Sequence, residues 1–119
     1  LVTGVQTCAL PIYELEKNYV SGITFSGGDP LHTQNRKDVG ALIEEIKEKF
    51  PNKTIWIYSG YDWQDVKDLP CMKYVDVMVD GEFVDGLKDN KLLWRGSTNQ
   101  KVIDVQKSLE IDKVVLAVK

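Results

Sequence analysis

The sequence is poor in cysteine and contains no long apolar run. Its two cysteines, Cys8 and Cys71, stand far apart in a chain of 119 residues, so they form neither a metal-ligand cluster nor a disulfide framework. This usage is typical of a reducing, cytoplasmic compartment. No apolar stretch approaches the roughly 20 residues needed to cross a bilayer. Basic residues are no more abundant than acidic ones, and the net charge of −3 argues against nucleic acid or an anionic membrane as partner.

The remaining composition is ordinary for one soluble globular domain. Hydrophobic residues make up 43% of the chain and charged residues 28%, and there is no low-complexity tract or internal repeat, so disorder is not expected. Residues 2–12 nevertheless resemble, residue for residue, the translation of a widely used sequencing-library adapter. Because segments of that kind are excluded from fold reasoning, we expect residues 1–12 to be non-native and residues 13–119 to hold the natural domain. Cys8 then carries no functional meaning.

Hydrophobic periodicity predicts an alternation of strands and helices. Apolar residues at positions 39, 42, 43, 46 and 50 predict a helix from residue 35 or 36 to residue 50. The β-branched and aromatic run at 54–58 predicts a strand covered on both faces. Asp62 is expected to cap a short helix at 63–69 that Pro70 ends. Other expected elements are helical turns at 13–20 and strands at 23–25, 75–79, 92–94 and 114–118, the last at a sheet edge. Such alternation indicates β-α-β units and a parallel sheet.

A glycine loop directly follows the strand expected at 23–25. Its residues are Ser26, Gly27, Gly28, Asp29 and Pro30. Two adjacent glycines permit positive φ and leave bare peptide groups against which a ligand can lie. Pro30 fixes its own φ and holds Asp29 out of the helical region. The alternative interpretation is an ordinary turn from strand to helix.

Three expected strands end in the same way. Ser26-Gly27, Ser59-Gly60 and Asp80-Gly81 each place a short polar residue before a glycine. In parallel α/β architecture the carboxyl ends of the strands lie on one side of the sheet, where ligands bind, so the three exits are expected to converge on a site. The alternative is that a polar residue followed by glycine is common turn chemistry.

The polar run at residues 95–100 is a further candidate. It contains the guanidinium of Arg95 together with two hydroxyls and two amides, which suits recognition of a carboxylate or a ribose. A solvated turn is the alternative. His32 and Cys71 are interpreted as structural residues, and Trp56, Trp63 and Trp94 as core or half-buried packing.

Four segments together carry a family resemblance. They are GITFSGGDPLH from residue 22, TIWIYSGY from 54, VDVMVDGEF from 75 and LLWRGSTNQ from 92. In this order they resemble the activating proteins of the anaerobic (class III) ribonucleoside-triphosphate reductase, which are small radical S-adenosylmethionine enzymes. The resemblance runs from about Tyr13 to Val105. It implies an α/β fold: a partial, open (β/α) barrel with parallel strands, lacking here its first βα unit.

The resemblance also implies the chemistry. A 4Fe–4S cluster on a Cys-x3-Cys-x2-Cys loop reduces S-adenosylmethionine, and the resulting 5′-deoxyadenosyl radical takes hydrogen from a glycine of the large reductase subunit. A reductant such as flavodoxin is the implied electron donor. The residues that we expect at the cofactor are the glycine loop along its methionyl end, the other strand exits, and the polar run: Ser26, Gly27, Gly28, Asp29, Pro30, Ser59, Tyr61, Asp80 and Arg95.

One departure from the family pattern is decisive. The three-cysteine loop is absent, its place is taken by the adapter-like residues, and neither Cys8 nor Cys71 replaces it. We therefore expect this chain to be inactive and its first natural strand to have an unpaired edge. Two other functions remain as alternatives. One is an activase for a different glycyl-radical enzyme, and the other is a non-redox nucleotide-binding module, against which Pro30 and the lack of a phosphate-loop motif argue.

Overall fold

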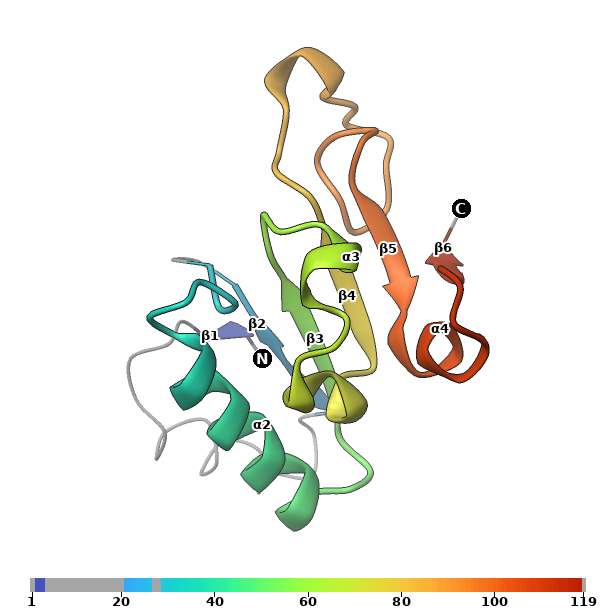
Figure 1. Ribbon diagram of the computed structural model, residues 1–119. Helices are drawn as coiled ribbons and strands as arrows, with labels where there is room; N and C mark the ends of the chain where they lie inside the picture. The colour runs from blue at the N-terminus through green and yellow to red at the C-terminus, as the bar shows by residue number, and fades with distance from the viewer. Residues whose placement is uncertain (1, 4–20, 27–28, 119) are drawn as a thin grey trace.

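The described part of the chain forms one open, mixed β-sheet (Figure 1). The computed structural model describes residues 2–3, 21–26 and 29–118, so the turns expected at 13–20, Cys8, Gly27 and Gly28 lie outside it. Within these ranges the strand order is β1-β2-β3-β4-β5-β6. The strands are β1 (Val2–Thr3), β2 (Gly22–Phe25), β3 (Thr54–Tyr58), β4 (Val77–Asp80), β5 (Lys101–Asp104) and β6 (Leu116–Val118).

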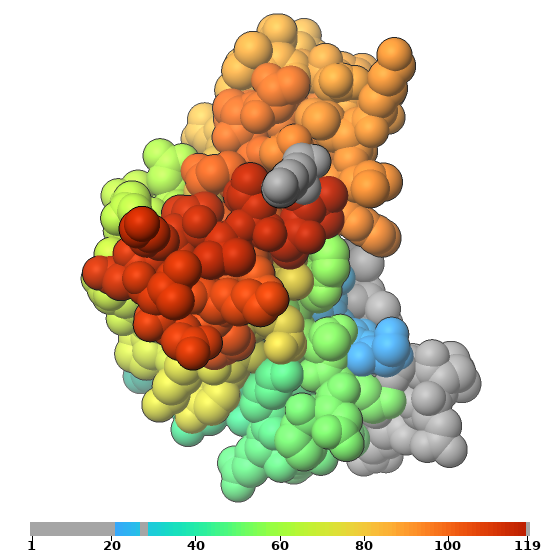
Figure 2. Space-filling model, turned by 90° about the vertical axis from the view of Figure 1, so that its right-hand side faces the viewer, coloured from blue at the N-terminus to red at the C-terminus, as the bar shows by residue number. Residues whose placement is uncertain are grey.

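Helices cover one face of the strands β2 to β4. The helical elements are α2 (Arg36–Lys49), α3 (Trp63–Val66), α4 (Val105–Ile111) and the 3₁₀ turns η1 (Pro70–Tyr74) and η2 (Asp85–Leu87). Figure 1 shows α2, α3 and η1 in front of the sheet, and the segment from β4 to β5 projecting beyond the carboxyl ends of the parallel strands. The same segment stands out from the body of the molecule in Figure 2. None of the described helices has the length and apolar character of a membrane-spanning segment.

The apolar pattern of α2 explains how it packs on the sheet. Its residues Val39, Leu42, Ile43 and Ile46 are buried, which confirms the helix expected from their spacing. In β3 the residues alternate instead, with Ile55 and Ile57 fully buried and the residues between them partly exposed. The expectation that this strand is covered on both faces is therefore wrong for the described part of the chain, in which α2 and η1 pack on the face that carries Ile55 and Ile57.

Several expected boundaries shift in the structure. The strand expected at 75–79 begins at Val77 and ends at Asp80. The helix expected at 63–69 ends at Val66, and Pro70 begins the separate 3₁₀ turn η1. Asp62 makes no capping hydrogen bond, contrary to expectation. Residues 92–94 form no strand. The edge strand expected at 114–118 is confirmed, over Leu116–Val118.

The expectation of a wholly parallel sheet is also wrong. Strands β1 to β4 are parallel, but β5 is antiparallel to β4, and β6 is antiparallel to β5. The sequence prediction missed β5 and α4 entirely. The edge of β2 that was expected to be unpaired carries β1, with Val2 opposite Thr24 and Thr3 opposite Phe25. The described fold is thus α/β with an open sheet whose first four strands are parallel.

Gly22 sets the close approach of β2 and β3, and this predicts the effect of a substitution. Gly22 lies opposite Thr54, and a Cβ added at Gly22 would overlap the Oγ1 and the carbonyl oxygen of Thr54. Gly22→Ala should therefore lower the free energy of unfolding by about 1–3 kcal/mol, as overpacking typically does. Urea denaturation measures this change.

Gly86→Ala is the matched control, since nothing lies within 4 Å of a Cβ added at Gly86. We expect this control to leave the urea midpoint nearly unchanged. Equal midpoints for the two variants would show that the contact between Gly22 and Thr54 does not limit the pairing of β2 with β3.

Candidate functional site

The carboxyl ends of β2, β3 and β4 lie side by side, as expected for adjacent parallel strands. The exits of β2 and β3 are joined directly by Asp29. Its Oδ1 accepts a hydrogen bond from Ser59 Oγ at 2.8 Å, and its Oδ2 accepts one from Gly60 N at 3.0 Å. Asp29, Ser59, Gly60 and Gly81 line a shared hollow of about 310 Å³. The predicted convergence of the three exits is confirmed for the described residues.

Asp29 holds this end of the sheet together through its carboxylate. Besides its bonds across to β3, Oδ1 accepts from Leu31 N at 3.0 Å, and the carbonyl oxygen of Asp29 accepts from His32 N. Its φ is 39°, in the positive region that Asp tolerates better than most residues. These hydrogen bonds position the loop and the exit of β3.

Ser59 and Tyr61 extend the same network toward α2 and β4. Ser59 is buried, and its Oγ accepts from Tyr61 N at 3.1 Å while donating to Asp29. The guanidinium of Arg36 lies 5.1 Å from the centre of the Tyr61 ring, and the carbonyl of Tyr61 accepts from Gly81 N. Tyr61 therefore connects α2 to the exit of β4.

Protein groups bind the side chain of Asp80 at the exit of β4. Its side chain is fully buried and accepts hydrogen bonds from Trp63 N at 2.9 Å and Lys101 N at 3.0 Å. Lys101 Nζ lies 3.0 Å from Oδ2. The carboxylate thus accepts a hydrogen bond from the first N–H group of α3, which is the capping role expected of Asp62. It also forms an ion pair with Lys101 at the start of β5. A buried charge requires such partners, so Asp80 is a structural anchor beside the site.

The polar run at residues 95–100 is closed on itself by hydrogen bonds. Arg95 Nη1 donates to the carbonyl oxygen of Gln100 at 2.7 Å, and Gln100 Oε1 accepts from the N–H groups of Gly96 and Ser97. Gln100 Nε2 donates to the carbonyl oxygen of Gly81, which fastens the run to the exit of β4. Gln100 lines the hollow at the strand exits, whereas Arg95 lines none of the described cavities.

A larger hollow of about 500 Å³ lies along the face of β2 and β3 opposite α2. Its walls include two aromatic side chains of β3, hydroxyl-bearing residues of both strands, and the indole of Trp94 from the projecting segment: Thr24, Ser26, Thr54, Trp56, Tyr58 and Trp94. Trp56 and Trp94 meet edge to face, with ring centroids 5.3 Å apart. Tyr58 lines both hollows, so they adjoin at this residue.

Sequence reasoning missed most of this open face. The three tryptophans were expected to be core or half-buried packing residues, which is confirmed for Trp63 in the core and for the half-buried Trp56, but Trp94 is 56% exposed. Burial raises the pKa of Tyr58, whose hydroxyl donates to the carbonyl oxygen of Trp94 at 2.7 Å. The alternation of residues in β3 was the available signal, because it separates Trp56 and Tyr58 from the buried isoleucines.

Known proteins resemble the chain over most of its length. The family model described as 4Fe-4S single cluster domain matches residues 5–103. A protein of Enterobacteria phage T4 named anaerobic ribonucleoside-triphosphate reductase-activating protein is 47% identical over 88 residues, which are 74% of this chain and 56% of that protein. Proteins of the same name from Salmonella typhi and Escherichia coli (strain K12) are 47% and 46% identical over 83 residues, covering 68% of this chain and 54% of each protein.

The chain therefore spans about half the length of the curated relatives it matches. No solved structure matches it significantly.

The hydrogen bonds of Asp29 predict a loss of stability on its removal. Asp29→Ala leaves the partly buried N–H groups of Leu31 and Gly60 and the hydroxyl of Ser59 without their acceptor. We expect the free energy of unfolding to fall by about 1–3 kcal/mol, measured by urea denaturation.

Asp62→Ala is the control, because Asp62 is exposed and forms no capping bond. If Asp29→Ala lowers the free energy of unfolding by no more than this control does, Asp29 does not hold the exits of β2 and β3 together.

Proposed function

Since the chain belongs to the 4Fe-4S single cluster domain family, we propose that it is part of an activating enzyme of anaerobic ribonucleoside-triphosphate reductase. The resemblance seen in the sequence is confirmed, because the similar proteins reported above carry the name of that activating protein. The proposed activity is the installation of a glycyl radical on the large reductase subunit, which is the proposed partner. S-adenosylmethionine is the proposed cofactor, and a reductant such as flavodoxin the proposed electron donor.

The observation that carries this proposal is the hollow on the open face of β2 and β3. It is large enough for a small-molecule site, and it begins beside Ser26, where the glycine loop leaves β2. S-adenosylmethionine combines an adenine ring, a sulfonium cation and a zwitterionic amino acid end. The rings of Trp56, Tyr58 and Trp94 suit the adenine and the sulfonium, and the hydroxyls of the wall suit the polar end.

The site residues divide into two groups under this proposal. Ser26 lines the hollow, and Gly27, Gly28 and Pro30 belong to the loop that continues from it, so we propose these as the cofactor contacts. The other residues expected at the cofactor support the site through the protein. They are Asp29, Ser59, Tyr61, Asp80 and Arg95, each bound to groups of neighbouring strands, helices or loops.

The described residues do not fit a 4Fe–4S cluster. Among them no three His, Cys, Asp or Glu side chains are grouped as a metal site. Cys71 is the cysteine that the structure describes, and it is buried; burial above all raises the pKa of its thiol, which disfavours the thiolate needed as an iron ligand. We assign no cluster ligand to this part of the chain and no reaction step to the cluster.

Two observations weigh on the alternative functions. The relatives reported above are named for the ribonucleotide reductase, which favours that partner over another glycyl-radical enzyme. A phosphate-binding loop of the kind that module would use binds phosphate through backbone N–H groups at the start of a helix, and this is disfavoured at α2 because the N–H groups of Asn35 and Arg36 already donate to the carbonyl oxygen of His32.

The open face predicts a specific effect on cofactor affinity. Trp56→Leu removes an aromatic wall of the hollow. Because stacking of a base on an aromatic ring contributes about 1–3 kcal/mol, the Kd for S-adenosylmethionine should rise roughly tenfold or more. Isothermal titration calorimetry on the 119-residue chain measures the Kd.

Ile111→Ala is the control, since Ile111 is an exposed apolar residue of α4 that lines none of the described cavities. Urea denaturation establishes that both variants remain folded. An unchanged Kd for Trp56→Leu would place the cofactor elsewhere.

The cysteine content predicts the outcome of cluster reconstitution. After anaerobic incubation with iron and sulfide, the 119-residue chain should show no stoichiometric visible absorbance from a 4Fe–4S cluster, because its two cysteines cannot supply the usual ligand set. The variant Cys71→Ser should behave identically. A stable cluster signal that disappears in Cys71→Ser would contradict this prediction.

A further inference from the structure

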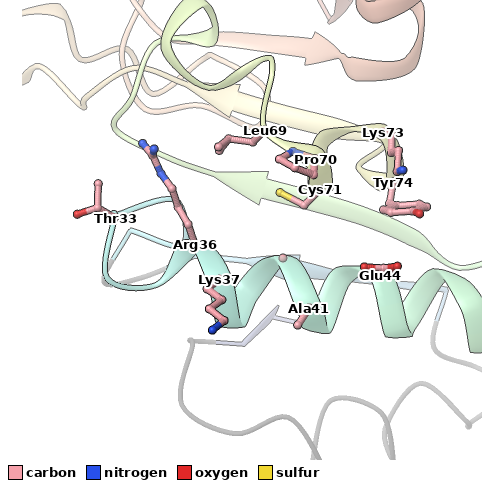
Figure 3. Close-up of a pocket in the computed structure, with 11 residues that line it drawn as sticks. Thr33, Arg36, Lys37, Ala41, Glu44, Leu69, Pro70, Cys71, Lys73 and Tyr74 are labelled. Atoms are coloured by element: carbon pink, nitrogen blue, oxygen red, sulfur yellow. The ribbon is translucent and has the colours of Figure 1, made fainter.

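A third cavity lies on the helix-covered side of the sheet, between α2 and η1 (Figure 3). Its volume of about 520 Å³ is within the range of about 300–1,000 Å³ that small-molecule sites occupy. Figure 3 shows Pro70 and Cys71 of η1 on the opposite side of the groove from α2. Gly40 of α2 leaves room between the two elements, since a Cβ added there would come only to within 3.7 Å of the Cys71 Cβ. The groove therefore has an apolar floor that no side chain of α2 fills at this point.

The rim of the groove is cationic. Arg36, Lys37 and Lys73 line it, against the single carboxylate of Glu44, although the chain as a whole has a net charge of −3. Arg36 is held in place, because its Nε donates to the carbonyl oxygen of Leu31 at 2.6 Å and its guanidinium lies over the ring of Tyr61. The groove thus concentrates positive charge on an otherwise acidic protein, which favours an anionic ligand.

The two ends of the groove differ in chemistry. Thr33, Arg36 and Lys37 lie at the amino-terminal end of α2, and Lys73, Tyr74 and Glu44 lie at the other end (Figure 3). Lys73 Nζ lies over the Tyr74 ring, 5.1 Å from its centre. Arg36 and Glu44 are eight helical residues apart, or about 12 Å along the axis. A half-buried tyrosine ring next to a carboxylate suits a planar ring that carries N–H donors. The opposite end suits phosphate oxygens.

We propose that this groove binds a nucleoside phosphate. The phosphate groups lie against Arg36 and Lys37, the base stacks on the face of the Tyr74 ring that Lys73 does not cover, and the carboxylate of Glu44 accepts a hydrogen bond from an amino group of the base. The sugar crosses the apolar floor above Gly40. This site is on the opposite side of the sheet from the hollow proposed for S-adenosylmethionine, and it does not depend on that assignment.

The test uses ATP as the probe and the complete 119-residue chain, with saturating S-adenosylmethionine present so that an adenosine-binding site on the open face is occupied. Isothermal titration calorimetry should detect ATP binding, and inorganic triphosphate or adenosine alone should bind at least about tenfold more weakly than ATP. Gly40→Leu should abolish the binding by filling the groove. Lys37→Ala and Tyr74→Leu should each raise the Kd for ATP roughly tenfold, as one lost charged contact or stacking contact implies.

The controls separate this site from the other and from simple unfolding. Lys91→Ala removes an exposed lysine of the projecting segment and should leave the Kd for ATP unchanged. Gly40→Leu should not lower the urea midpoint, because leucine is a better helix former than glycine. It should leave the Kd for S-adenosylmethionine unchanged, because Gly40 does not line the hollow on the open face. Trp56→Leu should leave the Kd for ATP unchanged.

Three results would overturn the proposal. They are no ATP binding to the unaltered chain, ATP binding that survives Gly40→Leu or Tyr74→Leu in folded protein, and inorganic triphosphate binding as tightly as ATP. If a short glutamate-rich peptide binds at the groove and ATP does not, the groove accepts an acidic polypeptide instead.

Discussion

The buried carboxylate of Asp80 is the constraint on which the rest of the structure depends. A charge with no exposed surface is stable only if protein groups replace the water it has lost. Trp63 at the start of α3 and Lys101 at the start of β5 supply those groups. Two segments distant in the chain are thus fixed at the end of β4, and at this point the sheet changes from parallel to antiparallel pairing.

A second carboxylate, that of Asp29, performs a similar task between β2 and β3. The hollow on the open face of β2 and β3 is lined mainly by hydroxyl-bearing and aromatic residues, and neither of these two carboxylates lines it. Such a surface binds through stacking and neutral hydrogen bonds. The groove between α2 and η1 has the opposite character, because its rim carries lysine and arginine. The open face of the sheet therefore suits aromatic rings and neutral polar groups, whereas the groove on the helix-covered side suits anionic groups.

The local sequence pattern was sufficient to predict an element whose buried residues are regularly spaced along the chain. The spacing of Val39, Ile43 and Ile46 predicted α2, and the convergence of the strand exits followed from the parallel order of β2 to β4. β5 and α4 were missed, because no glycine or proline separates them: Asp104 is the last residue of β5 and also caps α4. The direction of β5 is set by its pairing with β4. No local pattern specifies whether a short strand pairs parallel or antiparallel.

The sequence by itself determined the family, the α/β alternation and the convergence of the strand exits, because these depend on residues that are neighbours in the chain or regularly spaced along it. Only the tertiary structure decided what the polar side chains do. Asp29 and Ser59 are 30 residues apart, and Asp80 and Lys101 are 21 apart. Whether a carboxylate is left for a ligand or bound by the protein depends on which distant backbone N–H groups folding brings beside it. Packing decides this, because a buried carboxylate is stable only when the surrounding strands and helices supply hydrogen-bond donors to it.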